Sequence, residues 1–185
     1  MRRALALLLV AAAAQAEPVG YALDLTHTFV TVEVVHGGLS TTRLRFDRKQ
    51  GTLEVDRAAG TGRVEVTLEM ASVKSGVEAF DRQLQGPDFF DVAAHPTARF
   101  VGDRFSFAGN RVAEVAGTLT LKGRSEAVVL KATNFDCYTS PLFKREVCGG
   151  DFTATVARSR FGLGGLPALA PDEVRLLVQV EGVRL

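Results

Sequence analysis

The sequence has no excess of charge of one sign, no tryptophan and only two cysteines. Its 22 Lys and Arg residues balance 21 Asp and Glu residues, so the formal net charge of the 185-residue chain is +1. A protein that binds a phosphate backbone needs a basic surface, and this balance therefore argues against nucleic acid as a partner. A hydrophobic share of 46% excludes a disordered tail, and the length is that of one globular domain.

Long hydrophobic runs are also missing, and the longest one lies at the start of the chain. After Arg2 and Arg3, an apolar run extends from Ala4 to Ala14 and leads into the small-x-small pattern Ala14-Gln15-Ala16. This order is typical of a secretory signal peptide, whereas a membrane-spanning helix needs roughly 20 apolar residues. We expect residues 1–16 to be a signal peptide, residues 17–185 to be a single periplasmic or secreted domain, and no stable insertion in a membrane. The alternative is an uncleaved membrane anchor.

The two cysteines, Cys137 and Cys148, are eleven positions apart in the part of the chain expected to be exported. In an oxidising compartment such an isolated pair is typical of a disulfide, which would remove about 3 kcal/mol of unfolded-state entropy. A metal site would need further ligands, and the nearest histidine, His95, is more than forty residues away. We therefore expect a disulfide between these cysteines, no metal and no cofactor.

Alternation of apolar and polar residues is the dominant pattern of the remaining chain. From Val64 to Met70 every even position is apolar and every odd position is polar, which predicts a strand with one buried face. The long alternating segments are Thr28–His36, Val64–Met70, Ala113–Lys122 and Val174–Glu181, and the shorter candidates are Arg43–Phe46, Thr52–Val55, Thr97–Val101, Arg104–Phe107, Ala127–Ala132 and Asp151–Ala157. Turns are expected at Gly37-Gly38, Gly60-Thr61-Gly62, Gly109-Asn110 and Gly149-Gly150.

Only the segment Val77–Leu84 has a helical pattern, and Gln85-Gly86-Pro87 ends it. Because parallel strands need crossover helices, about eight to ten strands with one short helix predict an all-β antiparallel sheet. Such a sheet closes into a barrel or folds into a sandwich, and the pattern does not choose between them. The apolar rows are mainly Val, Ala, Leu and Gly, which would leave room for a small ligand inside a barrel of about eight strands. A fully packed interior fits the pattern equally well.

Signatures of catalysis are scarce. His27 and His36 are nine positions apart, an odd separation that directs them to opposite faces of a regular strand, and His95 lies in a turn-like segment. Hydrogen-bonding roles at strand ends are therefore expected for the histidines. The chain has no Gly-x-Ser-x-Gly elbow and no phosphate-binding glycine loop, and Gly162-Leu163-Gly164-Gly165 is expected to be a flexible turn. We predict no catalytic residue, and an acid/base role for His36 is the alternative.

Five local motifs occur in a distinctive order. They are Asp24-x-x-His27-Thr28 with the alternating strand that follows; Asp88-Phe89-Phe90-Asp91 followed by Pro96 and Phe100; Gly117-Thr118-Leu119-Thr120-Leu121-Lys122-Gly123; Arg158-Ser159-Arg160-Phe161-Gly162; and Asp172-Glu173-Val174. Together they resemble the YceI-like family of exported, lipocalin-like proteins, and the resemblance spans residues 20–185. It implies an eight-stranded antiparallel barrel with a short helix and a lumen open at one end, which holds a polyisoprenoid or fatty-acid-like chain. A homodimer is compatible with it.

Two segments depart from the family pattern, since Phe80-Asp81-Arg82-Gln83-Leu84 replaces Arg-Asp-x-x-Leu and Gly37-Gly38-Leu39-Ser40 replaces Gly-Phe-Ser. Arg158 and Asp88 are expected either to form an ion pair at the mouth or to remain solvated. The candidate lipid-binding residues of the lumen are Val30, Val32, Val34, His36, Val66, Leu68, Phe89, Phe90, Phe100, Leu119, Leu121, Val128 and Leu130. The expected function is to hold a linear apolar molecule as a carrier, reservoir or sensor. The alternatives are an enzyme that acts on such a lipid and a ligand-free interaction module of the cell envelope.

Overall fold

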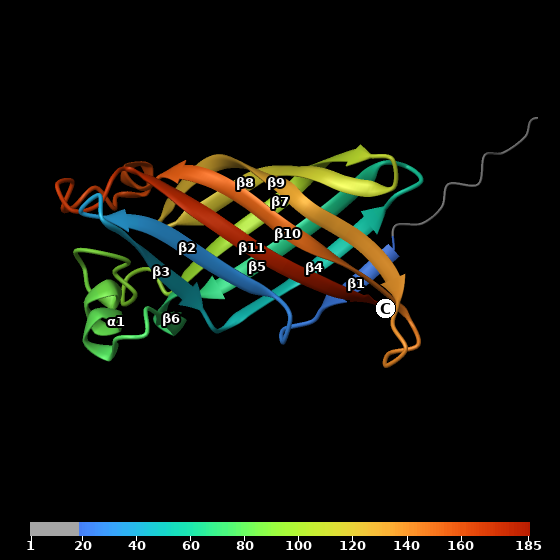
Figure 1. The fold of residues 1–185 in the computed structure, drawn as a ribbon, viewed down its shortest axis with the longest axis horizontal. Helices are drawn as coiled ribbons and strands as arrows, with labels where there is room; N and C mark the ends of the chain where they lie inside the picture. The colour runs from blue at the N-terminus through green and yellow to red at the C-terminus, as the bar shows by residue number, and fades with distance from the viewer. Residues whose placement is uncertain (1–18) are drawn as a thin grey trace, which may run out of the picture.

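Eight strands form a closed antiparallel barrel in the computed structural model, which describes residues 19–185 (Figure 1). The predicted signal peptide, residues 1–16, lies outside the described residues. The described residues contain eleven strands, of which eight form this ring. The eleven strands are β1 (Val19–Leu23), β2 (Phe29–His36), β3 (Ser40–Phe46), β4 (Lys49–Asp56), β5 (Thr61–Glu69), β6 (Val73–Lys74), β7 (Thr97–Ala108), β8 (Arg111–Leu121), β9 (Arg124–Thr139), β10 (Glu146–Ala157) and β11 (Glu173–Arg184). The described residues also form helix α1 (Glu78–Gln85) and the 3-10 turns η1 (Met70–Ser72) and η2 (Arg158–Phe161).

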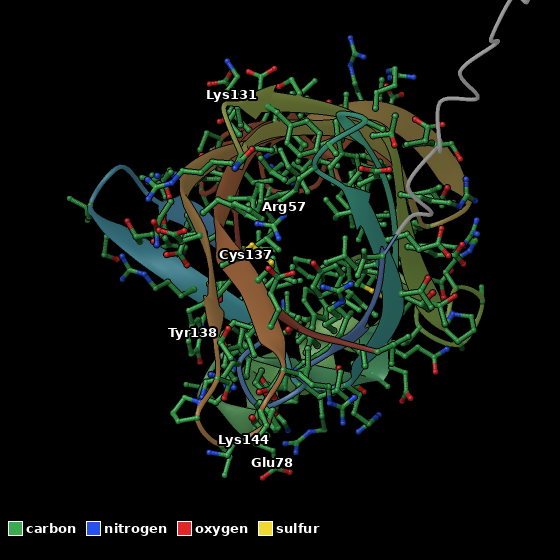
Figure 2. All side chains as sticks on the ribbon, turned by 90° about the vertical axis from the view of Figure 1, so that its right-hand side faces the viewer. Arg57, Glu78, Lys131, Cys137, Tyr138 and Lys144 are labelled. Carbon is green, nitrogen blue, oxygen red and sulfur yellow. A yellow bond between two sulfur atoms is a disulfide. The ribbon has the colours of Figure 1, made fainter. Side chains whose placement is uncertain are left out.

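The ring of the barrel runs through β1, β4, β5, β7, β8, β9, β10 and β11, and it closes where β1 pairs with β11. Every pairing between neighbours is antiparallel, and Figure 2 shows the strands arranged around the barrel axis. Closure removes the free edges that an open sheet would expose. The eight-stranded antiparallel barrel with one short helix that the sequence predicts is confirmed.

Strands β2, β3 and β6 form a branch that leaves the ring at one end. One edge of β11 pairs first with β2, through Arg175–Gln179, and then with β1, through Gly182–Arg184. The outer strand β3 pairs with β6 only at Arg45 and Phe46, and α1 lies beside this part of the sheet (Figure 1). Backbone ladders therefore close the barrel at the end where β1 begins, whereas a branch and a helix surround the other end, which we call the mouth.

Helix α1 is fixed at both ends by local chemistry. The carboxylate of Asp81, which is buried, accepts hydrogen bonds from the backbone N–H and the hydroxyl of Ser75 at 2.6 and 2.7 Å, and these bonds tie the first turn to the preceding loop. Gly86 and Pro87 follow the last turn, as the sequence predicts, because proline cannot continue a helix. The helix buries Leu84 against the barrel, so its position defines one wall of the mouth.

The strands differ from the sequence prediction in several places: β1 and β6 were not predicted, and β4, β9 and β10 are longer than the predicted segments. Gly149 and Gly150 do not form a turn but lie inside β10, where a Cβ atom on Gly150 would stand 2.2 Å from a carbonyl oxygen of β9; the pair permits close backbone approach. The two segments predicted between Thr97 and Phe107 form one strand, β7, with an irregular register beside Asp103. In β8 the register shift makes Val112 buried in place of Ala113. Such bulges break the period of two on which the prediction depends.

The hydrophobic core divides into two clusters along the barrel axis. The cluster at the ladder-closed end consists of Tyr21, Val55, Val112, Val115, Phe135, Cys148 and Phe152. The cluster near the mouth consists of Leu44, Phe46, Met70, Val73, Leu84, Phe90 and Ala98. Within residues 19–185 no helix is long and apolar enough to cross a bilayer.

Candidate functional site: the lumen of the barrel

An apolar cavity of about 390 Å³ lies inside the mouth end of the barrel, and we call it the outer cavity. Strands β2, β3, β5, β8 and β11, helix α1 and the segment that joins β10 to β11 all contribute side chains to its wall. The lining is apolar except for His36, Thr42, Gln83 and Arg158. This volume is within the range of about 300–1,000 Å³ that is typical of small-molecule sites.

A second, inner cavity of about 120 Å³ continues toward the ladder-closed end. Its wall is apolar except for Arg99, whose guanidinium pairs with Glu65 at 2.7 Å. The two cavities share the wall residues Val30, Leu68, Ala98, Leu119 and Leu176, so they adjoin along the barrel axis. Phe135 and Phe152, whose rings meet edge to face at 6.4 Å, are part of the wall of the inner cavity. The lumen is therefore wide at the mouth and narrow inside.

All thirteen predicted lumen residues line these cavities, although their contact with a ligand stays a prediction. Those of the outer cavity are Val32, Val34, His36, Phe89, Phe90 and Leu121; those of the inner cavity are Val66, Phe100, Val128 and Leu130; and Val30, Leu68 and Leu119 line both. The alternation identified the members on strands β2, β5, β8 and β9, because inward positions recur every second residue, whereas Phe89, Phe90 and Phe100 came from the family motif.

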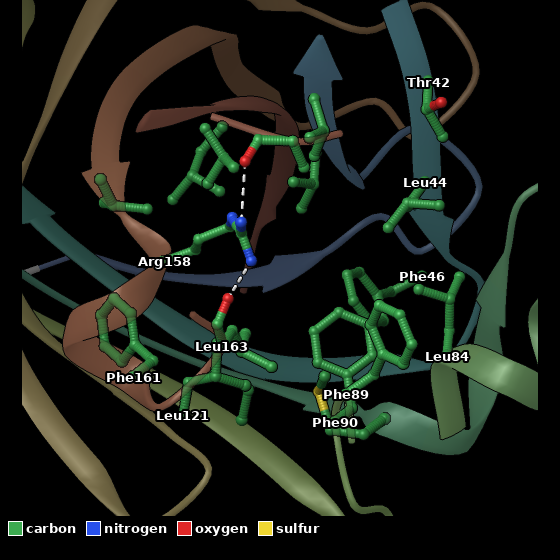
Figure 3. A pocket seen from close by; sticks show the side chains of 18 of the residues that line it. Thr42, Leu44, Phe46, Leu84, Phe89, Phe90, Leu121, Arg158, Phe161 and Leu163 are labelled. Carbon is green, nitrogen blue, oxygen red and sulfur yellow. Dashed lines mark hydrogen bonds between the residues drawn. The ribbon is translucent and has the colours of Figure 1, made fainter. Parts of the chain in front are cut away.

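An aromatic wall covers one side of the outer cavity. Phe46 of β3 and Phe90, which follows α1, meet edge to face with ring centroids 5.8 Å apart, and Phe89 and Leu84 lie beside them (Figure 3). Of these residues, the sequence prediction included only Phe89 and Phe90. Phe46 ends a short strand and Leu84 lies on the helix, and neither position carries a lumen signal in the alternating pattern. These rings give this side of the outer cavity an aromatic, apolar surface.

The opposite side of the mouth is a segment of residues 162–172, here called the strap, which joins η2 to β11. Arg158 holds it: Nε donates to the carbonyl of Pro171 at 2.9 Å, Nη1 to the carbonyls of Leu163 and Gly165, and Nη2 to that of Ala170 at 2.8 Å (Figure 3). Four backbone carbonyls therefore depend on one guanidinium. The expected ion pair of Arg158 with Asp88 is wrong, and so is a solvated Arg158, while Asp88 itself is exposed.

The strap was predicted as a flexible turn at Gly162-Leu163-Gly164-Gly165, but Arg158 anchors it and its side chains reach the lumen. Leu163, Leu166 and Leu169 all line the outer cavity. The strap also contacts the tip of the β2–β3 hairpin, because the N–H of Gly37 donates to the carbonyl of Leu169 at 2.7 Å. No alternation marks this Gly- and Pro-containing stretch, so the sequence carried no signal for these leucines.

Polar side chains in the lining stand at the mouth. His36 and Gln83 are exposed and Thr42 is half-buried, and within residues 19–185 none of the three side chains has a hydrogen-bond partner in the protein. They are therefore free to bond to the polar end of a molecule whose apolar part lies deeper. His36 has no carboxylate partner that would orient it as an acid or base, in contrast to His27, whose Nδ1 lies 2.9 Å from Asp24 Oδ2.

A polar cluster closes the narrow end of the barrel. The hydroxyl of Tyr21 donates to Glu146 Oε1 at 2.7 Å, and Arg57 Nη2 lies 2.5 Å from Glu146 Oε2. Burial, with help from the Glu146 carboxylate, raises the pKa of Tyr21 to about 12. Burial opposes the charge of Glu146, but the hydrogen bonds from Tyr21 and Arg57 outweigh it and keep the pKa of Glu146 below its ordinary value. The buried polar groups at this end are thus paired.

The predicted disulfide between Cys137 and Cys148 is confirmed, and it joins directly opposed residues of β9 and β10 near the same end. The sulfur of Cys148 lies 3.6 Å from the Tyr21 hydroxyl. The disulfide and the Tyr21–Glu146 pair therefore tie β1, β9 and β10 together at the closed end, away from the mouth.

Elsewhere in the described part of the chain, one group of metal-ligating side chains is not bound in the disulfide: Asp24, His27 and Glu181. Hydrogen bonds from Thr26 and His27 lower the pKa of Asp24 to about 2, and Asp24 raises the pKa of His27. His27 thus forms a hydrogen bond next to the start of a strand, as the sequence predicts. The absence of a metal in the protein stays a prediction.

A closed antiparallel barrel with an apolar cavity that opens at one end defines the lipocalin-like class of β-barrels. Comparison with known proteins gives the family: the model of the YceI-like domain matches residues 21–182. The chain therefore belongs to the YceI-like family.

Relatives support this assignment over nearly the whole chain. A curated relative, the UPF0312 protein of Pseudomonas savastanoi pv. phaseolicola, is 31% identical over 175 residues, which cover 93% of this chain and 90% of the relative. Among solved structures, Burkholderia cenocepacia BcnA has a TM-score of 0.72 at 24% identity over 86% of this chain and 98% of its own. A polyisoprenoid binding domain from Saccharophagus degradans has a TM-score of 0.62 at 14% identity over 89% of this chain and 98% of its own. These structures share the fold.

Proposed function

We propose that the protein binds a linear apolar molecule, of the polyisoprenoid or acyl class, in the lumen and acts as a carrier, reservoir or sensor. The observation that carries the proposal is the apolar outer cavity of about 390 Å³, which adjoins the inner cavity along one axis. Such a shape suits a chain that enters at the mouth and extends inward. A structural relative with the same fold is described as a polyisoprenoid binding domain, which agrees with the proposal.

The energetics favour loose selectivity along the chain of the ligand. Each buried methylene contributes roughly 0.8 kcal/mol relative to water, so one isoprene unit contributes a few kcal/mol. The bilayer offers the same gain, and ordering of the ligand subtracts from it. The free energy of binding in the lumen therefore needs only to equal that of insertion in the membrane. Selectivity then comes from the length of the ligand and from its polar end.

The mouth suits a ligand with an uncharged polar end better than a phosphorylated one. A phosphate group needs cationic donors, yet the guanidinium of Arg158 is occupied by four backbone carbonyls. Thr42 and Gln83 offer uncharged hydrogen-bonding groups instead. A polyprenol or a prenylated ring should thus bind more tightly than the corresponding polyprenyl phosphate.

Native mass spectrometry of protein purified without detergent tests the proposal directly, and the expected result is an added mass of lipid. A prenyl or acyl fluorescent probe should also bind, and Val30→Phe, at the junction of the two cavities, should shorten the longest chain accepted. The matched control is Val129→Phe, because Val129 is 42% exposed on the outer face of β9. A protein that is empty and ignores all probes, or one in which the two variants behave alike, contradicts the proposal.

A further inference from the structure

The mouth of the barrel carries exposed leucines that the lumen alone does not explain. Leu39 at the tip of the β2–β3 hairpin is 92% exposed, and Leu166 and Leu169 on the strap are 53% and 45% exposed. We call these three residues the apolar rim. The hydrogen bond from Gly37 to Leu169 holds the hairpin tip against the strap, and Figure 1 shows both segments at the same end of the barrel. The rim is therefore one connected surface feature.

The segments that form the apolar rim carry no charged residue of their own, and the nearby guanidinium of Arg158 is bonded to strap carbonyls. No charged residue occurs from Gly37 to Thr42 or from Gly162 to Pro171. The loops at the opposite end do carry charges, namely Arg57, Lys144 and Arg145. Exposed leucines without neighbouring charge are costly in water, since apolar area left in water forgoes the free energy of burial. The rim is thus an uncharged apolar sector of a mouth whose α1 side carries exposed Glu78 and Arg82, and this local contrast points to contact of the rim with an apolar phase.

We propose that the apolar rim docks the protein, mouth first, on the surface of a lipid bilayer. Leu166 and Leu169 also line the outer cavity, so a docked rim would place the lumen in direct contact with the bilayer interior. A protein partner fits less well, because interface hot spots are enriched in Trp, Tyr and Arg, and the rim has none of these. A bilayer requires no matching hydrogen bonds from leucine. The docking itself does not depend on the identity of the lumen's ligand.

The experiment measures binding to large unilamellar vesicles of phosphatidylcholine that contain no isoprenoid. Because residues 19–185 form the closed barrel and both core clusters, the chain from Glu17 onward is used. The unmodified protein should float with the vesicles, and the binding should be insensitive to salt because the rim is uncharged. Leu39→Ser should weaken binding about tenfold, and Leu39→Ser combined with Leu166→Ser should abolish it.

The matched control is Leu142→Ser, since Leu142 is 81% exposed at the opposite end of the barrel and should not affect vesicle binding. Leu39 does not line the cavity, so Leu39→Ser should take up a soluble prenyl probe as the unmodified protein does, which also verifies its fold. Failure of the unmodified protein to bind vesicles, or equal weakening by Leu142→Ser, overturns the inference. A rim variant that alters the sedimentation of the protein but not its binding to vesicles also overturns the inference, because the rim would then be an interface between two copies of the chain. Vesicle binding without probe uptake would instead contradict the proposed function alone.

Discussion

Replacement of Arg158 by methionine removes the hydrogen-bond donors that hold the strap while keeping a side chain of similar length. Four backbone carbonyls would lose their partner. Each such bond contributes roughly 0.5–1 kcal/mol here, after a discount for the half-buried position and for water that replaces the donor. The total of about 2–4 kcal/mol corresponds to an increase of about 30- to 1,000-fold in the population with an open strap.

Hydrogen–deuterium exchange of the strap amides provides the direct assay, and the dissociation rate of a bound prenyl probe provides the second. Both rates should rise in Arg158→Met, while exchange in the barrel strands should stay unchanged. The control is Arg160→Met, because Arg160 is a neighbouring, exposed arginine that pairs with Glu126 at 3.0 Å. Arg158→Lys should restore only part of the protection of the strap amides, since an ammonium group cannot reproduce the planar arrangement of donors in a guanidinium. Unchanged strap exchange in Arg158→Met would refute the reasoning.

Two further predictions concern the closed end of the barrel. Replacement of Cys137 and Cys148 together by serine should lower the free energy of unfolding by about 3 kcal/mol in a urea titration, because the unfolded chain regains the entropy of the open loop. The binding of a prenyl probe at the mouth should stay unchanged. Equal stability of the two proteins would contradict this prediction. The pKa of Tyr21 is raised from 10.0 to about 12, so its contribution to stability is complete below pH 10 and is lost as pH rises toward 12. The stability difference between the unmodified protein and Tyr21→Phe should therefore shrink over that interval, and a constant difference would argue against the assignment.

Alternation in the sequence predicted most strands of the barrel wall, but it missed β1, which closes the ring. In β5 the alternation from Val64 to Met70 identified the inward face, because the period of two is the geometry of a strand. The prediction failed where the backbone departs from that period. The bulge that brings Val112 inward in place of Ala113 and the glycines buried in β10 depend on contacts between strands distant in sequence.

The mouth was the least predictable part of the candidate site. Arg158 belongs to a family motif, yet its partners are carbonyls of Leu163, Gly165, Ala170 and Pro171, and a carbonyl has no sequence signature. The aromatic wall is similar, since Phe46 and Phe90 are far apart in sequence and meet only because a helix closes the barrel beside β3. Sequence patterns predict the features that depend on one strand alone, whereas the structure of the mouth depends on tertiary contacts.

Along one edge of β11 the partner strand changes from β2 to β1, and as a result the two ends of the barrel differ in how firmly the wall is held. Next to β1 the backbone ladders form an unbroken hoop, so its circumference is fixed by hydrogen-bond geometry. Next to β2 the hoop is interrupted: β3 bonds to β6 at only two positions, and side-chain packing of α1 completes the wall. Packing yields at lower cost than a ladder, so we expect the wall at the mouth to deform more readily than the wall at the opposite end.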